Sequence, residues 1–208
     1  MRIIGGEFKR RQIESPPEGS TTRPMPDMVR EAIFNLLRGH VEGQAVIDCF
    51  CGTGTMGLEA VSRGADRVVL VERDRRVVRL LETNIERLGV EDRCDVVAGD
   101  ALGPAAWSAC PKPVHLVFFD PPYAMVRDEK DWPRVREAFG RLVGLLDREG
   151  YGVLRTPWPF TRPGDAEGDP PVDVPLEIEG AIGPETHVYR NTAVHLYMKD
   201  PALFEGDA

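Results

Sequence analysis

This 208-residue chain has no long apolar run, and its first residues do not have the pattern of a secretory signal. The longest largely apolar stretches, residues 68–71 and 114–119, fall far short of the roughly 18 residues that a membrane-spanning helix needs. Residues 1–11 are rich in charge and lack the apolar segment of a secretory signal. We therefore expect a cytoplasmic protein that makes no contact with a membrane.

Cysteine is scarce, and its spacing argues against the sites that are most often built from it. The four cysteines form no C-x-x-C pair, and no histidine lies at ligand spacing to them. We expect reduced thiols and no metal ion. Glycine (21) and proline (18) also stay below the share, about 25%, that is typical of disordered low-complexity chains.

The charge is unevenly distributed along the chain. A net charge of −8 argues against a uniformly basic surface that coats nucleic acid. Residues 1–38, however, carry seven basic and five acidic side chains, whereas residues 165–185 carry seven acidic and no basic ones. The acidic segment, interleaved with glycine and proline, is interpreted as a solvated loop, and any polyanion is expected to bind at the front of the chain.

Strand and helix patterns alternate through most of the chain. Strands are predicted at residues 45–49, 67–72, 95–98, 114–119 and 152–154, and helices at 27–39, 56–63, 74–88 and 132–146. Such alternation predicts a doubly wound, Rossmann-like α/β sheet that is covered on both faces. Two further strand-like stretches, 176–182 and 187–198, predict an antiparallel C-terminal hairpin that turns at Gly183-Pro184.

A glycine-rich turn follows the first strand. Gly52, Gly54 and Gly57 have G-x-G-x-x-G spacing, and Glu72 lies 20 residues after Gly52, as in dinucleotide-binding folds. NAD is therefore one possible ligand. Asp48, expected at the mouth of this turn, favours instead a ligand with an ammonium group, because a carboxylate would repel a pyrophosphate.

S-adenosylmethionine carries such an ammonium group. It also offers a ribose diol that Glu72 could bind and an adenine amine that Asp100 could bind. Each of these acids alone could equally be a helix cap or a turn residue, but together they match three donor groups of one cofactor. We expect the cofactor to contact residues at the strand ends: Asp48, Phe50, Gly52, Gly54, Glu72, Asp100 and Ala101.

The segment Asp120-Pro121-Pro122-Tyr123, called the corner below, follows the buried strand 114–119. Two prolines restrict the backbone, so the Asp120 carboxylate and the Pro121 carbonyl are expected to form a rigid pair of acceptors. Such a pair suits the exocyclic amine of a nucleobase, on which Tyr123 could stack. A plain turn with a partly buried tyrosine is the simpler alternative. We expect the four corner residues to be catalytic.

Several motifs point to one family. They are Gly5-Gly6 with its following basic residues, Thr22-Arg23-Pro24, Asp27-x-Val29-Arg30-Glu31, the loop 48–60, Glu72-x-Asp74 and the corner. Together, over about residues 1–155, they resemble the RsmD-type 16S ribosomal RNA guanine-N2 methyltransferases, of the class I S-adenosylmethionine-dependent fold. The chain departs from that family at Arg10, where glycine is common, at Met25, where threonine is usual, and at Tyr189-Arg190, where the family has Tyr-Gly.

The resemblance implies methylation of the N2 amine of a guanine in small-subunit (16S) ribosomal RNA, either free or in the small ribosomal subunit. We expect RNA contacts at basic residues near the start of the chain: Arg2, Lys9, Arg10, Arg11 and Arg23. The chain is then divided into an RNA-contacting extension and helix (1–40), a catalytic domain (41–200) and a tail (201–208), and is expected to be a monomer. A DNA adenine-N6 methyltransferase, an NAD-dependent oxidoreductase and a non-catalytic RNA-binding module remain alternatives.

Overall fold

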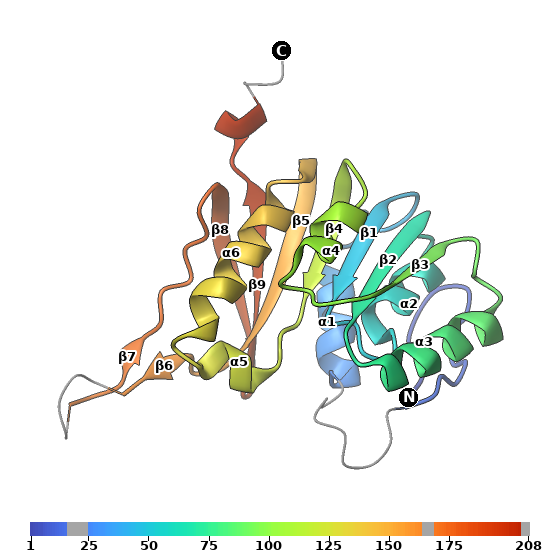
Figure 1. Cartoon of the computed structure of the whole chain (residues 1–208), viewed down its shortest axis with the longest axis horizontal. Helices are drawn as coiled ribbons and strands as arrows, with labels where there is room; N and C mark the ends of the chain where they lie inside the picture. Colours follow the sequence, from blue (N-terminus) through green and yellow to red (C-terminus); the bar gives the residue numbers. More distant parts are fainter. Residues whose placement is uncertain (16–24, 164–168, 205–208) are drawn as a thin grey trace.

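The computed structural model describes residues 1–15, 25–163 and 169–204, and its centre is a seven-stranded sheet (Figure 1). The strand order is β3-β2-β1-β4-β5-β9-β8. The strands are β1 (Ala45–Cys49), β2 (Arg67–Glu72), β3 (Cys94–Ala98), β4 (Val114–Phe119), β5 (Leu146–Pro157), β8 (Ala181–Tyr189) and β9 (Thr192–Lys199). The first five strands are parallel, and β9 and β8 are antiparallel, which confirms the predicted doubly wound sheet with its C-terminal hairpin.

Helices cover both faces of the sheet (Figure 1). The strands alternate between the two cores: Leu116 and Phe118 pack with one group of helices, Val117 and Phe119 with the other. The first group is α1 (Asp27–Leu36), α2 (Thr55–Ser62) and α3 (Arg75–Leu88), and the second is α4 (Pro104–Ala109), α5 (Tyr123–Arg127) and α6 (Asp131–Val143). A two-stranded ribbon of β6 (Thr161–Arg162) and β7 (Val172–Asp173) and the short helix η1 (Pro201–Phe204) complete the chain. None of the helices described has the length and apolarity required to cross a bilayer.

Two predicted boundaries are wrong. Helix α6 ends at Val143, not at residue 146, and β5 begins at Leu146 and is much longer than the predicted 152–154. The pairing of β5 with β4 jumps from Leu146 to Tyr151, so the polar residues between them bulge out of the ladder. Because this stretch is polar and contains a glycine, its sequence is typical of a loop.

The C-terminal hairpin also turns at a different place from the one predicted. Its two-residue turn is Arg190-Asn191, flanked by the pair Tyr189 and Thr192, and Arg190 has a left-handed φ of 56°. Gly183-Pro184 lies inside β8, where the pairing with β9 shifts register. Strand β8 is at the edge of the sheet, and edge strands and bulges tolerate proline because they need no N–H at that position.

The start of the chain folds back onto α2 and joins the core of the sheet. An antiparallel bridge pairs Arg2 with Gln12, and Ile3, Phe8 and Ile13 are buried in the same cluster as the side chains of α2. Figure 1 shows this front segment (residues 1–15) beside α2 and α3. The two parts share one hydrophobic core, and the division into an RNA-contacting extension and a catalytic domain stays a prediction.

Gly6 is the tightest point of this docking. A Cβ at Gly6 would lie 1.8 Å from the Ser62 carbonyl oxygen, and its φ is +72°. Gly39 has a similar φ of +89°, but a Cβ there meets nothing within 4 Å. Gly39→Ala should therefore lower the free energy of unfolding only by the strain of a left-handed residue, about 1 to 2 kcal/mol. Gly6→Ala should lower it by about 1 to 3 kcal/mol more, because its Cβ also clashes with the Ser62 carbonyl. Denaturant unfolding of both variants checks this, and equal losses would mean that the front segment is not docked as described.

Candidate active site

The glycine turn after β1 and the corner after β4 lie side by side. Strands β1 and β4 are direct neighbours, with Cys49 opposite Phe119 in the ladder. The backbone N–H of Asp120 donates to the carbonyl of Cys49, with an N···O distance of 3.4 Å. The two predicted halves of the site therefore meet at the carboxyl edge of the sheet, where ligands of open α/β folds bind.

The glycine turn is packed on one side and open on the other. A Cβ at Gly54 would lie 2.5 Å from a methyl carbon of Leu81 on α3, so the turn sits directly against that helix. A Cβ at Gly52 would meet nothing within 4 Å. Phe50, with a left-handed φ of 61°, lies edge-on to Phe119. The backbone of the turn is thus exposed on the side where a ligand could approach it.

Asp48 lies behind the turn, not at its mouth as predicted. Its side chain is buried, and Oδ2 accepts a hydrogen bond of 2.8 Å from the N–H of Gly57. Burial raises the pKa of Asp48 to about 8, with repulsion from Asp120 and Glu72 adding to the rise and the Gly57 hydrogen bond opposing it. The carboxyl group therefore keeps its proton near neutral pH in the protein alone, and its contact with an ammonium group stays a prediction.

Glu72 and Asp100 also make contacts with nearby backbone. The Oε2 atom of Glu72 accepts from Gly52 N–H at 3.1 Å and its Oε1 from Asp74 N–H at 2.8 Å, so the end of β2 is tied to the glycine turn. Asp100 is exposed, and its Oδ1 accepts from Leu102 N–H at 3.0 Å. Its neighbour Ala101 is buried. A carboxylate has about four acceptor positions, so these bonds leave room for ligand donors.

The corner contains an ion pair that sequence reasoning missed. Arg155 on β5 donates from Nε to Oδ1 of Asp120 at 2.6 Å and from Nη2 to Oδ2 at 2.9 Å. The two side chains are 12% and 20% exposed, so the pair is partly buried but open to solvent on one side. Burial by itself lowers the pKa of Arg155, but attraction and hydrogen bonding to Asp120 outweigh burial, and the net pKa is raised.

Tyr123 is held by two residues of the sheet, Thr192 and Arg155. Its hydroxyl donates to Thr192 Oγ1 at 2.6 Å, and that hydroxyl in turn donates to the carbonyl of Thr156 at 3.1 Å. The Arg155 guanidinium lies 5.1 Å from the centroid of the Tyr123 ring, within cation–π range. Of the two prolines, Pro121 is buried and Pro122 is exposed. Thr192, like Arg155, was not among the predicted site residues.

The basic residues predicted to contact RNA are distributed over the front segment. Lys9, Arg10 and Arg11 are exposed at its tip, and Arg10 has a left-handed φ of 73°. Arg2 is exposed but paired with Asp27. The remaining candidate, Arg23, lies outside the described residues.

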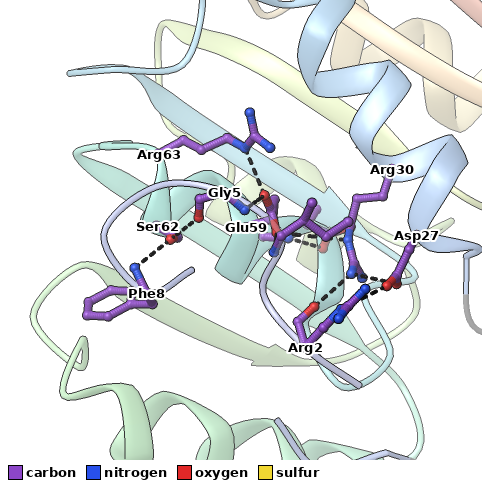
Figure 2. Close-up of polar contacts among 11 residues, drawn as sticks. Arg2, Gly5, Phe8, Asp27, Arg30, Glu59, Ser62 and Arg63 are labelled. Carbon is purple, nitrogen blue, oxygen red and sulfur yellow. Dashed lines mark hydrogen bonds and ion pairs between the residues drawn. The ribbon is translucent and has the colours of Figure 1, made fainter. Parts of the chain in front are cut away.

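A buried acid on α2 holds the front segment in place (Figure 2). Glu59 is fully buried and accepts from the backbone N–H groups of Ile4 and Gly5 at 2.7 and 2.8 Å. It also accepts from Arg63 Nε at 2.8 Å, and Arg30 Nε lies 3.9 Å away. Helix α2, which begins at the glycine turn, thus anchors the front segment nearer its other end.

Arg30 and Ser62 complete this anchor. Arg30 on α1 is 1% exposed, and its Nη2 donates to the carbonyl of Arg2 and to Asp27 Oδ1 (Figure 2). Ser62 Oγ donates to the carbonyl of Gly5 at 2.6 Å and accepts from the N–H of Phe8 at 2.9 Å. Arg30 belongs to the Val-Arg-Glu motif of the sequence. Its partner on α2, Glu59, is distant in the sequence, so the motif alone did not indicate this contact.

The sheet order, the glycine turn after β1 and the acid that ends β2 together define a class I methyltransferase fold. Within that class, the chain belongs to the family described as conserved hypothetical protein 95, whose model matches residues 1–139. The family is of the RsmD type, so the resemblance seen in the motifs is confirmed.

Individual relatives agree with this assignment. YlbH of Bacillus subtilis, named provisionally as an rRNA methyltransferase, is 28% identical over 204 residues, which are 96% of this chain and 99% of that protein. Ribosomal RNA small subunit methyltransferase D of Escherichia coli is 37% identical over 123 residues, which are 59% of this chain and 60% of that protein. A solved Escherichia coli structure, named provisionally as a methyltransferase, superposes with a TM-score of 0.72 at 28% identity, covering 96% of this chain and 98% of that one.

Proposed function

We propose that this protein is an S-adenosylmethionine-dependent methyltransferase that modifies the N2 amine of a guanine in small-subunit ribosomal RNA. The observation that carries the proposal is the position of the corner: Asp120 lies against the backbone of β1 beside the glycine turn, with its carboxylate partly exposed. The family and the names of its relatives support ribosomal RNA as the substrate.

The residues around the glycine turn fit the cofactor. The open side of Gly52 offers backbone to it, and Glu72 has acceptor positions left for ribose hydroxyls. Asp48 would lose its proton when an ammonium group approaches, and Asp100 with Ala101 would border the adenine. When bound, S-adenosylmethionine supplies an electrophilic methyl group: the amine nitrogen would bond to the methyl carbon as the bond to sulfur breaks to leave a neutral thioether, and the methylated amine would release one proton to Asp120 or to water.

The corner would hold that amine. The Asp120 carboxylate and the Pro121 carbonyl accept the two hydrogens of the guanine N2 amine, so that its lone pair can point at the methyl group. Tyr123, whose hydroxyl is fixed to the sheet, offers its ring to the base. Holding both reactants in near-attack geometry can supply up to about 7 to 11 kcal/mol of the barrier. The task of this chain is therefore positioning.

The exposed tip of the front segment is expected to bind the RNA backbone. Replacing Lys9, Arg10 and Arg11 together by glutamine should reduce the slope of log K against log salt by about 2, since each phosphate contact contributes roughly 0.7 to 0.9. The matched control replaces three arginines of α6 and β5, Arg134, Arg141 and Arg148, which are exposed and lie outside the front segment. An unchanged slope in the front-segment variant would place the RNA-binding face elsewhere.

The proposed reaction is tested by incubating the protein with methyl-labelled S-adenosylmethionine and unmodified 16S ribosomal RNA, or unmodified small subunits. Label is expected in the RNA of at least one of the two substrates, and none in duplex DNA. Thermal shift adds a direct test of the cofactor, because a ligand at 100 times its Kd stabilises a fold by about 2.7 kcal/mol. Stabilisation by NAD in place of S-adenosylmethionine, or RNA binding without transfer of label, would refute the proposal.

A further inference from the structure

We propose that Arg155 is a positioning residue for the target amine, because it holds Asp120 and Tyr123 in one fixed arrangement. The inference rests on the proposed function and deepens it. Arg155 is 35 residues away from Asp120 in the sequence, on a different strand, yet it contacts both side chains of the corner that face a substrate.

Arg155 fixes the plane of the Asp120 carboxylate. Nε and Nη2 of Arg155 each bond a different carboxylate oxygen, at 2.6 and 2.9 Å. This planar fork fixes the rotation of the carboxylate, and it uses one acceptor position on each oxygen. The remaining positions are free to accept an amine hydrogen, and their direction is set by the fork. A lysine could neutralise Asp120 but could not fix its plane in this way.

The same guanidinium also contacts Tyr123. Nη1, the third nitrogen of the same guanidinium, lies 3.4 Å from the Tyr123 hydroxyl, which itself donates to Thr192. The hydroxyl therefore has a donor on one side and an acceptor on the other, which restricts the ring. Arg155 thus fixes the position of Asp120, which would hold the amine, relative to Tyr123, which would stack on the base.

Arg155 and Thr192 lie on paired strands inside the sheet. Strand β5 is paired with β4 on one side and with β9 on the other, and Arg155 stands opposite Val194 on β9. Thr192, the second anchor of Tyr123, begins β9. The corner lies beyond the end of β4, so contacts with β5 and β9 help to fix the positions of its side chains.

Folding stability alone does not explain why residue 155 is an arginine. Ion pairs that are partly exposed contribute little to folding, and buried ones can be replaced by apolar residues at no loss. Arg155 lies between two fully buried residues of β5, Leu154 and Thr156, and removing its charge from water costs free energy. Its role is better explained by the corner that it organises.

The test compares Arg155→Lys with the wild type in methyl transfer to ribosomal RNA. We expect kcat to fall about 10- to 100-fold, because a misplacement near 1 Å can cost about 100-fold. KM for RNA, the affinity for S-adenosylmethionine and Tm should stay close to the wild-type values. Arg67→Lys is the matched control, since Arg67 pairs with Asp95 through Nε at 2.7 Å at the opposite end of the parallel strands. That variant should retain wild-type kcat.

Two further measurements separate positioning from a merely structural role. If Arg155 acts through Asp120, then Arg155→Lys should change kcat little in an Asp120→Asn background, whereas independent effects would multiply. In nitrogen-15 NMR spectra, the Arg155 Nε–H should be protected from exchange in the wild type and less protected in Asp120→Asn, where one amide oxygen replaces two carboxylate oxygens, with no change in Arg67→Lys.

The outcomes distinguish this inference from the proposed function. A wild-type protein that transfers methyl groups to RNA, with an Arg155→Lys variant of equal kcat, would overturn the role of Arg155 alone. An unprotected Arg155 Nε–H would overturn it whatever the substrate is. A fall in Tm and cofactor affinity that parallels kcat would make Arg155 a structural residue and would also overturn the inference.

Discussion

Asparagine in place of Asp120 is expected to lower kcat for methyl transfer about 100- to 1000-fold, the usual loss when one preorganised polar group of an active site is removed. The single amide oxygen must then serve both Arg155 and the target amine, and the amide NH₂ faces a guanidinium donor. Cofactor affinity should change little, because Asp120 is not among the residues expected to hold the cofactor. Single-turnover transfer and thermal shift with S-adenosylmethionine measure the two quantities.

The choice of asparagine follows from the ion pair. Alanine at this position would leave the 12% exposed guanidinium of Arg155 without its partner, which would mix a folding defect with the catalytic one. Asp95→Asn is the matched control, because Asp95 also pairs with an arginine but lies at the far edge of the sheet. Turnover of Asp120→Asn equal to the wild type would show that the corner does not hold the reacting amine.

Alanine in place of Glu59 is expected to destabilise the protein by about 3 to 5 kcal/mol, as when one partner of a buried charge cluster is removed. The change leaves two backbone N–H groups of the front segment without their acceptor, and among the residues that the structure describes it leaves Arg30 with Asp27 as its only acidic partner (Figure 2). At about 2 to 4 °C per kcal/mol for a chain of this size, Tm should fall roughly 6 to 20 °C. Thermal and denaturant unfolding measure this loss.

Glutamine at the same position separates stability from RNA binding. Glu59→Gln keeps one acceptor for the front segment, so we expect a smaller loss of stability together with weaker RNA binding and unchanged cofactor affinity. Glu137→Ala is the control, because Glu137 forms an exposed pair with Arg141 on α6 and should cost less than about 1 kcal/mol. If Glu59→Ala melted at the wild-type temperature, the anchoring of the front segment would be wrong.

The sequence was sufficient to predict the parts of the site that are local. The glycine turn and the corner each follow a strand directly, Glu72 ends β2, and the parallel sheet brings the ends of neighbouring strands together. Alternating patterns therefore predicted the doubly wound sheet and the meeting of the turn with the corner. Which of these residues bind cofactor or substrate remains a prediction.

The contacts that the sequence did not predict join distant residues. Arg155 and Asp120 are 35 positions apart, and Thr192 and Tyr123 are 69 positions apart. No periodicity relates such pairs, and the predicted strand 152–154 stopped one residue before Arg155, whereas β5 extends to Pro157. An arginine close to a run of buried apolar residues was the one available sign.

Burial depth was the other property that the sequence could not provide. Asp48 lies near the end of the apolar strand β1 and was expected to face the ligand, but its carboxyl group is buried and accepts a hydrogen bond from Gly57 on α2. Glu59 was unremarked in the sequence because a glutamate on a helix is usually exposed. Glu59 accepts hydrogen bonds from the front segment, whose residues lie more than 50 positions earlier in the sequence, so no local pattern could indicate its role.

The most direct test of the central claim is to identify the methylated nucleoside in ribosomal RNA treated with the protein and S-adenosylmethionine. Nuclease digestion followed by chromatography and mass spectrometry is expected to give N2-methylguanosine, and about 100- to 1000-fold less of it in the same reaction time from the Asp120→Asn protein. A methyl group on adenine N6, on a ring carbon or on ribose would contradict a corner that grips the guanine amine.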